Sequence, residues 1–167
     1  ILPLDYPLPS SSGMNFTTSG VLRESSASPP TDPPGANTLF VPPEIASDVR
    51  LERVLRHHLS GLSGGDLEKL GGFFREGGFV YSRRPGRMRD VGDFVTLKRR
   101  GYCEHYAAAG ANLLRMAGIH SRIVTGYRGG RWNPWLRTIT VRDSDAHAWI
   151  EAWNPEAGQW IRFDPVD

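Results

Sequence analysis

Cys103 is the only cysteine of this 167-residue chain, and its position suits a reactive thiol. It follows a glycine break at Gly101 and opens a predicted helix, where unpaired N–H groups and the helix macrodipole favour negative charge. Such positions favour the thiolate, which is the nucleophilic form of cysteine. The alternative interpretation is a small buried apolar side chain. A single cysteine also excludes an internal disulfide and the two- and four-cysteine zinc frameworks.

A nucleophilic cysteine needs a base, and the base needs a group that orients it. Among the five histidines, His147 is best placed, because it begins a predicted strand over residues 146–153 directly after a polar turn. His105 is a poor direct partner, since residues two apart on a helix face different directions. The patterns around the other three favour surface, cap or turn positions: His57, His58 and His120.

Asp164 is the candidate orienting carboxylate, and strand register decides whether it can reach the base. If Asn154 pairs with Gln159 across a four-residue loop, Asp164 opposes Trp149, and His147 lies diagonally adjacent on the same face. A slip of one residue would send the two side chains to opposite faces. The alternative interpretation is a histidine at a sheet edge and an aspartate that forms a turn before proline.

Helical patterns come first along the part of the chain that must position these residues. Apolar residues at three- and four-residue steps predict a helix of about four turns over residues 45–59, and a second helix follows Asp66. Residues 79–81 form a short predicted strand, residues 83–89 an exposed basic loop, and Asp90 begins a short helix with Phe94 and Leu97 inward. The helix from Cys103 carries small residues up to Ala117, which would let it approach its neighbour closely.

The pattern then changes to a period of two, which is typical of strands. Four β-type runs are predicted, over residues 121–127, 138–142, 146–153 and 160–163. Helices followed by antiparallel strands indicate an α+β domain with a central helix packed against a sheet.

Composition divides the chain into an arm and a body. Nine of the 13 prolines lie before residue 44, while all five tryptophans and the cysteine lie after residue 87. We therefore expect a Pro/Ser-rich extended arm over residues 1–41, partly mobile, and one folded domain over residues 42–167.

Charge and hydropathy exclude several classes of protein. The 20 Lys and Arg residues nearly balance 18 Asp and Glu, for a net charge of +2, and no run of five like charges occurs, so nucleic-acid binding is not expected. No stretch of 18 apolar residues predicts a membrane span. The chain begins at Ile1 without a leader pattern, so we expect a soluble part of a longer protein.

Five ordered sequence blocks carry a resemblance to a known family. They are Gly101–Ala107, Leu114–Ile119, Thr125–Tyr127, Asp145–Trp149 and Phe163–Pro165. In order and spacing these blocks resemble the transglutaminase-like core, most of all that of the bacterial membrane-anchored transglutaminase-like proteins. The resemblance covers residue 42 to the C-terminus and is strongest from Phe73 onward.

The resemblance implies a papain-like fold with Cys103 as nucleophile, His147 as acid/base and Asp164 as orienting group. It implies no cofactor, and a protein, peptide or cell-envelope amide as substrate. Similar proteins carry this domain on the extracytoplasmic (periplasmic) face of the bacterial inner membrane, so the parent protein is expected to be anchored by segments outside this chain.

Three aromatic residues are candidates for contacts with the substrate. The backbone N–H of Cys103 can donate to an oxyanion, and the resemblance points to Tyr81 as an aromatic second donor; the alternative for Tyr81 is a core position. Trp132 and Trp135 could form a substrate rim, and packed core tryptophans are an equally ordinary explanation.

These residues predict thiol acyl transfer, in which a cysteine thioester forms from a carboxamide and is resolved by an amine or by water. Cross-linking of glutamine to an amine and papain-like amide hydrolysis share the first half of that reaction. A catalytically idle peptide-binding module is the alternative from another class. A metal site through Cys103, His105 and His147 would lack a fourth ligand.

Overall fold

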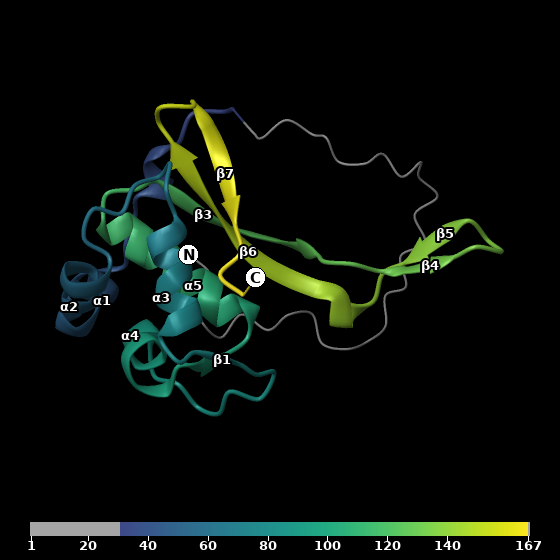
Figure 1. Cartoon of the computed structure of the whole chain (residues 1–167), viewed down its shortest axis with the longest axis horizontal. Coiled ribbons are helices and arrows are strands. Elements are labelled where there is room, and N and C mark those ends of the chain that lie inside the picture. The colour runs from purple at the N-terminus through teal and green to yellow at the C-terminus, as the bar shows by residue number, and fades with distance from the viewer. Residues whose placement is uncertain (1–30, 167) are drawn as a thin grey trace.

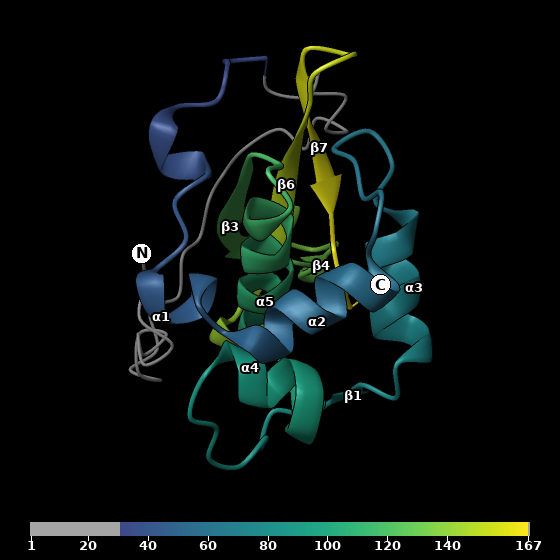
Figure 2. The ribbon, with the colours of Figure 1, turned by 90° about the vertical axis from the view of Figure 1, so that its left-hand side faces the viewer.

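A central helix lies between a sheet and a layer of helices in the computed structural model, which describes residues 31–166. Helix α5 (Cys103–Met116) packs on the antiparallel sheet formed by β3 (Ser121–Tyr127), β6 (Ala146–Asn154) and β7 (Gln159–Phe163), in the order β3-β6-β7 (Figure 1). Helix α2 (Val49–His58) covers the face of α5 that is turned away from the sheet, and α3 (Glu68–Glu76) lies beside them (Figure 2). The predicted α+β arrangement is confirmed.

Small residues bring α5 close to the sheet, as the sequence predicts. Ala107, Ala109, Gly110 and Ala111 are all buried. A Cβ atom built on Gly110 would lie 2.5 Å from the Cδ1 atom of Ile150 on β6, so this position has room only for hydrogen. The middle of α5 therefore packs directly against β6.

The helix predicted over residues 45–59 is divided in two, so that prediction is wrong at its N-terminal end. Helix α1 (Pro43–Ala46) ends at Ser47, and α2 starts after Asp48, whose side chain accepts a hydrogen bond of 2.9 Å from the backbone N–H of Arg50. An aspartate that caps a new helix favours non-helical backbone at its own position. The break lets α2 turn across α5.

The segment after Asp90 also differs from the prediction at one residue. Helix α4 (Val91–Asp93) continues into a π-helical turn, η2 (Phe94–Lys98). Phe94 and Val95 are buried there, whereas Leu97 is 63% exposed instead of facing inward. The wider π turn changes the angle between successive side chains and moves Leu97 off the buried face.

The predicted strand over residues 138–142 forms away from the main sheet. Strand β5 (Thr138–Thr140) pairs only with β4 (Arg131–Asn133), which the sequence did not indicate, and the two form a separate hairpin. This hairpin projects far from the body of the molecule (Figure 1). The sheet that packs on α5 therefore has three strands, and residues 138–140 are not among them.

The last residues of the predicted arm lie along the body. The carbonyl of Asp32 accepts a hydrogen bond of 2.8 Å from Trp160 Nε1, and Thr38 Oγ1, in the short helix η1 (Ala36–Thr38), lies 2.8 Å from His120 Nδ1. Most of the arm, residues 1–30, lies outside the described residues. Within residues 31–166, no helix is long and apolar enough to cross a membrane.

An ion-pair cluster joins α2 to α4. Arg50 contacts Asp48 at 2.7 Å, Asp90 at 2.8 Å and Asp93 at 3.0 Å, and Arg89 contacts Asp93 at 2.9 Å. The side chain of Asp93 is only 4% exposed. Arg89, and then Arg50, hold the pKa of this carboxyl well below its ordinary value of 3.8.

This cluster predicts a pH-dependent stability. Because the pKa of Asp93 is lowered by folding, its contribution is fully present above about pH 4 and is lost as the pH falls further. Asp93→Asn is therefore expected to lower Tm at neutral pH, and the difference from the wild type should narrow below about pH 4. Thermal unfolding across that range checks this, with the exposed Glu156→Gln as control. A Tm difference that stays constant with pH would contradict the prediction.

Candidate active site

Two short parallel strands place Tyr81 beside the start of α5. Strand β1 (Val80–Tyr81) pairs with β2 (Arg100–Gly101), and Tyr81 is in register with Gly101. A Cβ atom on Gly101 would lie 2.7 Å from the Phe94 ring and 2.8 Å from the Cβ of His105, so only glycine allows the chain to enter α5 this closely. Tyr81 is thus paired with Gly101, the residue that lies two positions before Cys103.

Cys103 is the first residue of α5, as predicted from the glycine break. Its thiol is free, and the residue is 4% exposed. The Tyr81 hydroxyl lies against the backbone N–H of Cys103 and against the Arg83 guanidinium. Burial, and then the negative charge of an ionised Cys103, raise the pKa of Tyr81. Cys103 is therefore buried at the start of α5, with the Tyr81 hydroxyl against its backbone N–H.

His147 and Asp164 meet as the proposed register requires. Asn154 pairs with Gln159, and the same register places Asp164 directly after the last residue of β7. Nε2 of His147 lies 2.5 Å from Oδ2 of Asp164. Their side chains are 8% and 3% exposed, so the contact is shielded from water. The predicted approach of these two side chains is confirmed.

Further contacts orient both members of this pair. The backbone N–H of Val166 donates to Asp164 Oδ1 at 3.3 Å, and Arg128 Nη1 lies 3.4 Å from Asp164 Oδ2. The imidazole of His147 stacks on Trp149 with 6.2 Å between ring centroids. Because Asp164 engages Nε2, the other ring nitrogen, Nδ1, is left for a reacting group.

A cleft of about 290 Å³ opens at His147. Its lining comes from β1 and the loop after it, the residue after β3, the turn η3 (Asp143–Asp145), the start of β6 and the C-terminus: Tyr81, Arg83, Arg128, Ser144, Asp145, Ala146, His147 and Val166. Arg83 Nη2 donates to the Ser144 carbonyl at 2.9 Å. Since Arg83 also touches Tyr81, it links the wall next to Cys103 with the wall that carries His147.

A family model matches more than half of the chain. The model of the transglutaminase-like superfamily matches residues 73–165, which include α5 with Cys103, β6 with His147, and Asp164 after β7. The chain belongs to the transglutaminase-like superfamily.

Individual relatives of this transglutaminase-like chain are bacterial. It is 46% identical over 90 residues to a protein-glutamine gamma-glutamyltransferase of Pseudomonas aeruginosa, which covers 53% of this chain and 13% of that protein. It is 37% identical over 80 residues to YebA of Bacillus subtilis, which covers 46% of this chain and 11% of that protein. The matched segments are thus a small part of both relatives.

A solved structure has the same fold. The periplasmic domain of TgpA from Pseudomonas aeruginosa, solved bound to ethylmercury, superposes with a TM-score of 0.65 at 34% identity. The match covers 77% of this chain and 47% of that domain. The papain-like, transglutaminase-like fold class is therefore confirmed for this chain.

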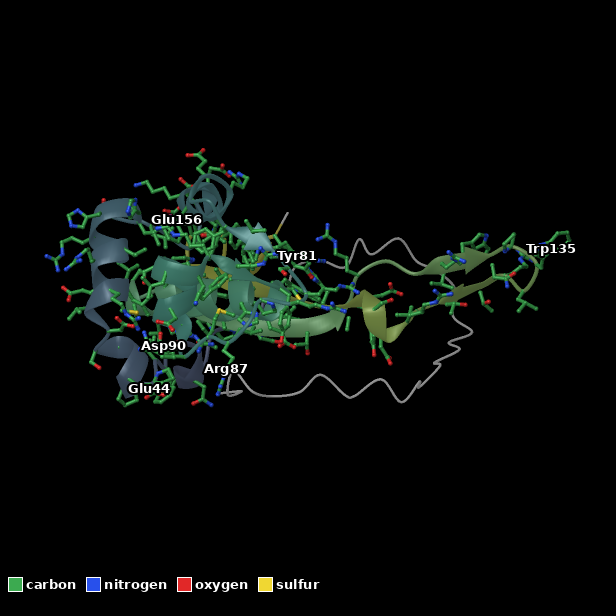
Figure 3. The ribbon with its side chains drawn as sticks, turned by 90° about the horizontal axis from the view of Figure 1, so that it is seen from below. Glu44, Tyr81, Arg87, Asp90, Trp135 and Glu156 are labelled. Atoms are coloured by element: carbon green, nitrogen blue, oxygen red, sulfur yellow. The ribbon has the colours of Figure 1, made fainter. Side chains whose placement is uncertain are left out.

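The structure does not bring Trp132 and Trp135 to the cleft. Trp132 lies in β4 and Trp135 at the tip of the hairpin, and neither lines the cleft around His147. Figure 3 shows Trp135 at the far end of the hairpin from Tyr81. The proposed rim is wrong for this cleft, and so is the alternative of packed core positions, since the two residues are 50% and 93% exposed.

Two arginines at the cleft were missed. Arg83 belongs to the exposed basic loop that the sequence indicates, and Arg128 directly follows the predicted strand over residues 121–127. The sequence indicates that these two arginines are exposed, but it does not indicate that they line a cleft. Loop length and strand periodicity do not identify the distant element that a long, flexible side chain reaches.

His105 has a local role at the start of α5. Its Nδ1 lies 3.4 Å from the backbone N–H of Tyr102, and its ring packs on Phe94 and Tyr102. Burial lowers the pKa of His105. Among residues 31–166 no three His, Cys, Asp or Glu side chains form a group that could hold a metal ion.

Proposed function

We propose that this chain is a thiol-dependent acyl transferase of transglutaminase type, which transfers the acyl group of a protein glutamine carboxamide to an amine through a thioester on Cys103. The observation that carries the proposal is the 2.5 Å contact between His147 and Asp164, in a cleft whose Tyr81 wall touches Cys103. A buried carboxylate that orients an imidazole, together with a thiol at the start of a helix, supports the proposal, because a nucleophilic cysteine needs a base and a group that orients that base.

The first half of the proposed reaction forms the thioester. The Cys103 thiol gives its proton to Nδ1 of His147, and the sulfur attacks the carboxamide carbon. Asp164, on Nε2, stabilises the imidazolium that results. The tetrahedral intermediate then expels ammonia, which takes the proton back from His147. The C–S bond has formed and the C–N bond has broken.

The second half releases the product. An amine gives a proton to His147 as its nitrogen attacks the thioester carbon, and the C–S bond breaks to form the new amide. His147 returns the proton to the sulfur, so the free enzyme is restored. Water in place of the amine would give a carboxylic acid, which makes hydrolysis the competing outcome of the same intermediate.

Tyr81 is proposed to complete the oxyanion site together with the Cys103 N–H. Its hydroxyl lies against that N–H, so a substrate oxygen entering there would meet two donors. Tyr81→Phe keeps the ring and is expected to lower kcat by about 10²-fold, with little change in KM. Steady-state kinetics checks this, with the similarly exposed Tyr127→Phe as control. Activity within about twofold of wild type would leave Tyr81 a packing role only.

A two-product assay tests the proposed function. With a glutamine-containing protein and a fluorescent primary amine, the full chain is expected to attach the amine and release one ammonia for each amine attached. Ammonia release without attachment would indicate an amidase instead, and peptide cleavage would indicate a cysteine protease. If no donor protein gives either amine attachment or ammonia release, that result would contradict the enzyme proposal.

The location of the chain is also a proposal. The TgpA structure is of a periplasmic domain, which supports an extracytoplasmic site for this chain and a parent protein anchored in the bacterial inner membrane by other segments. The substrate would then be a protein, peptide or cell-envelope amide outside the cytoplasm. Fractionation of cells that make the parent protein tests this, and recovery of the domain in the cytoplasm would contradict it.

A further inference from the structure

The β4–β5 hairpin has no role in the site described above, and it stands away from the body (Figures 1 and 3). Its strands pair Arg131 with Thr140 and Asn133 with Thr138. At the tip, Asn133 Oδ1 accepts hydrogen bonds from the backbone N–H groups of Trp135 at 3.0 Å and Leu136 at 3.1 Å. The turn therefore has a defined shape, and it presents these two side chains outward.

The tip is the most apolar exposed point of the described chain. Trp135 is 93% exposed and Leu136 is 70% exposed, more than any other large apolar side chain in residues 31–166. Trp132, behind them on β4, is 50% exposed. Isolated exposed apolar residues are ordinary, whereas apolar side chains gathered on one projection are typical of an interaction site.

The charge of the hairpin has one sign. Residues 128–142 contain four arginines and no aspartate or glutamate, although the whole chain is nearly neutral. Arg128 contacts Asp164 in the body, whereas Arg131, Arg137 and Arg142 are exposed along the hairpin itself. Positive charge behind an apolar tip is complementary to a surface that is anionic outside and apolar beneath.

We propose that this hairpin docks the domain on an anionic lipid bilayer. Trp135 and Trp132 would lie at the level of the headgroups, where tryptophan is enriched, with Leu136 among the upper acyl chains. The arginines would contact lipid phosphates. A narrow convex tip suits a deformable lipid surface better than a flat protein patch, where binding depends on well-packed pockets. This proposal is independent of the proposed enzymatic function.

Docking would set the height of the cleft above the lipid. Arg128 and His147, near the base of the hairpin, line the cleft, and each arm of about six residues spans roughly 20 Å. The cleft could then act on substrates that lie roughly 20 Å above the bilayer while the hairpin stays bound to the lipid.

Vesicle binding by the full chain tests the proposal. The probe is vesicles of equal parts phosphatidylglycerol and phosphatidylcholine, compared with phosphatidylcholine alone. We expect the wild type to sediment with the anionic vesicles, and brominated acyl chains to quench its tryptophan emission. The double variant Trp135→Ser, Leu136→Ser is expected to bind at least about tenfold more weakly and to lose most of the quenching. The double variant Arg131→Gln, Arg137→Gln is expected to lose about tenfold in affinity for the anionic vesicles only.

Matched controls separate docking from general stickiness. Val49→Ser with Leu97→Ser removes two apolar side chains that are 66% and 63% exposed on the body, and Arg84→Gln with Arg87→Gln removes two exposed arginines of another loop. Both control variants should bind as the wild type does, and all variants should keep its Tm. Wild type that does not bind anionic vesicles, or hairpin variants that bind equally well, would overturn the proposal. So would binding of the tip to a protein partner without any affinity for vesicles.

Discussion

Replacing Cys103 by alanine is expected to abolish amine attachment, with a fall in kcat of at least about 10⁴-fold. The reason is chemical: without the sulfur no thioester can form, and the remaining oxyanion donors cannot supply a covalent route. The substitution removes one small buried atom from the first turn of α5, so the fold and Tm should change little. Measurement of kcat beside the circular dichroism spectrum distinguishes loss of chemistry from loss of structure.

Alkylation of the wild type gives the complementary measurement. Because Cys103 is the only cysteine, a single mass increase after treatment with iodoacetamide locates the reaction without ambiguity. A thiol whose proton is taken by His147 should react faster at pH 6 than a free thiol does, because the thiolate is the form that reacts with iodoacetamide. Reaction no faster than a free thiol, together with no amine attachment by the wild type, would support the catalytically idle binding module instead.

The parts of the site that sequence could predict are those fixed by short-range rules. The break at Gly101 and the small residues after it determine where α5 begins and how closely it packs. A four-residue loop with Asn154 and Gln159 at its ends sets the register of β6 and β7, and that register alone brings His147 to Asp164. Because side chains alternate with a period of two, one correct pair determines the whole face.

Errors arose where a residue's environment depends on distant parts of the chain. The period of two correctly indicated a strand at residues 138–140, but periodicity does not identify the partner strand, and β4 pairs with it away from the body. Trp132 and Trp135 project with this hairpin and lie neither at the cleft nor in the core, the two positions that the sequence predicts. Leu97 was misplaced because the π turn changes the helical repeat, which a pattern based on 3.6 residues cannot anticipate.

Replacing Asp164 by asparagine is expected to lower kcat by about 10³-fold without unfolding the protein. The amide keeps the shape of the carboxylate but removes the charge that stabilises the imidazolium, and its NH₂ group can donate to Nε2. A donor at Nε2 would favour the tautomer with the proton on Nδ1, where it cannot accept the Cys103 proton. The defect should therefore lie in formation of the thiolate, before any substrate carbonyl is attacked.

This cause predicts which measurements change and which do not. In Asp164→Asn, alkylation of Cys103 at pH 6 should slow along with kcat, while KM stays near that of the wild type, because Asp164 acts through His147 and not on the substrate. Glu151→Gln is the matched control: Glu151 lies on β6, its side chain is 14% exposed and it contacts Arg122 at 2.6 Å, but it does not line the cleft. Its activity should stay within about twofold of wild type. If the two variants lost activity equally, the loss would come from weakening the sheet, and Asp164 would have no special part in orienting His147.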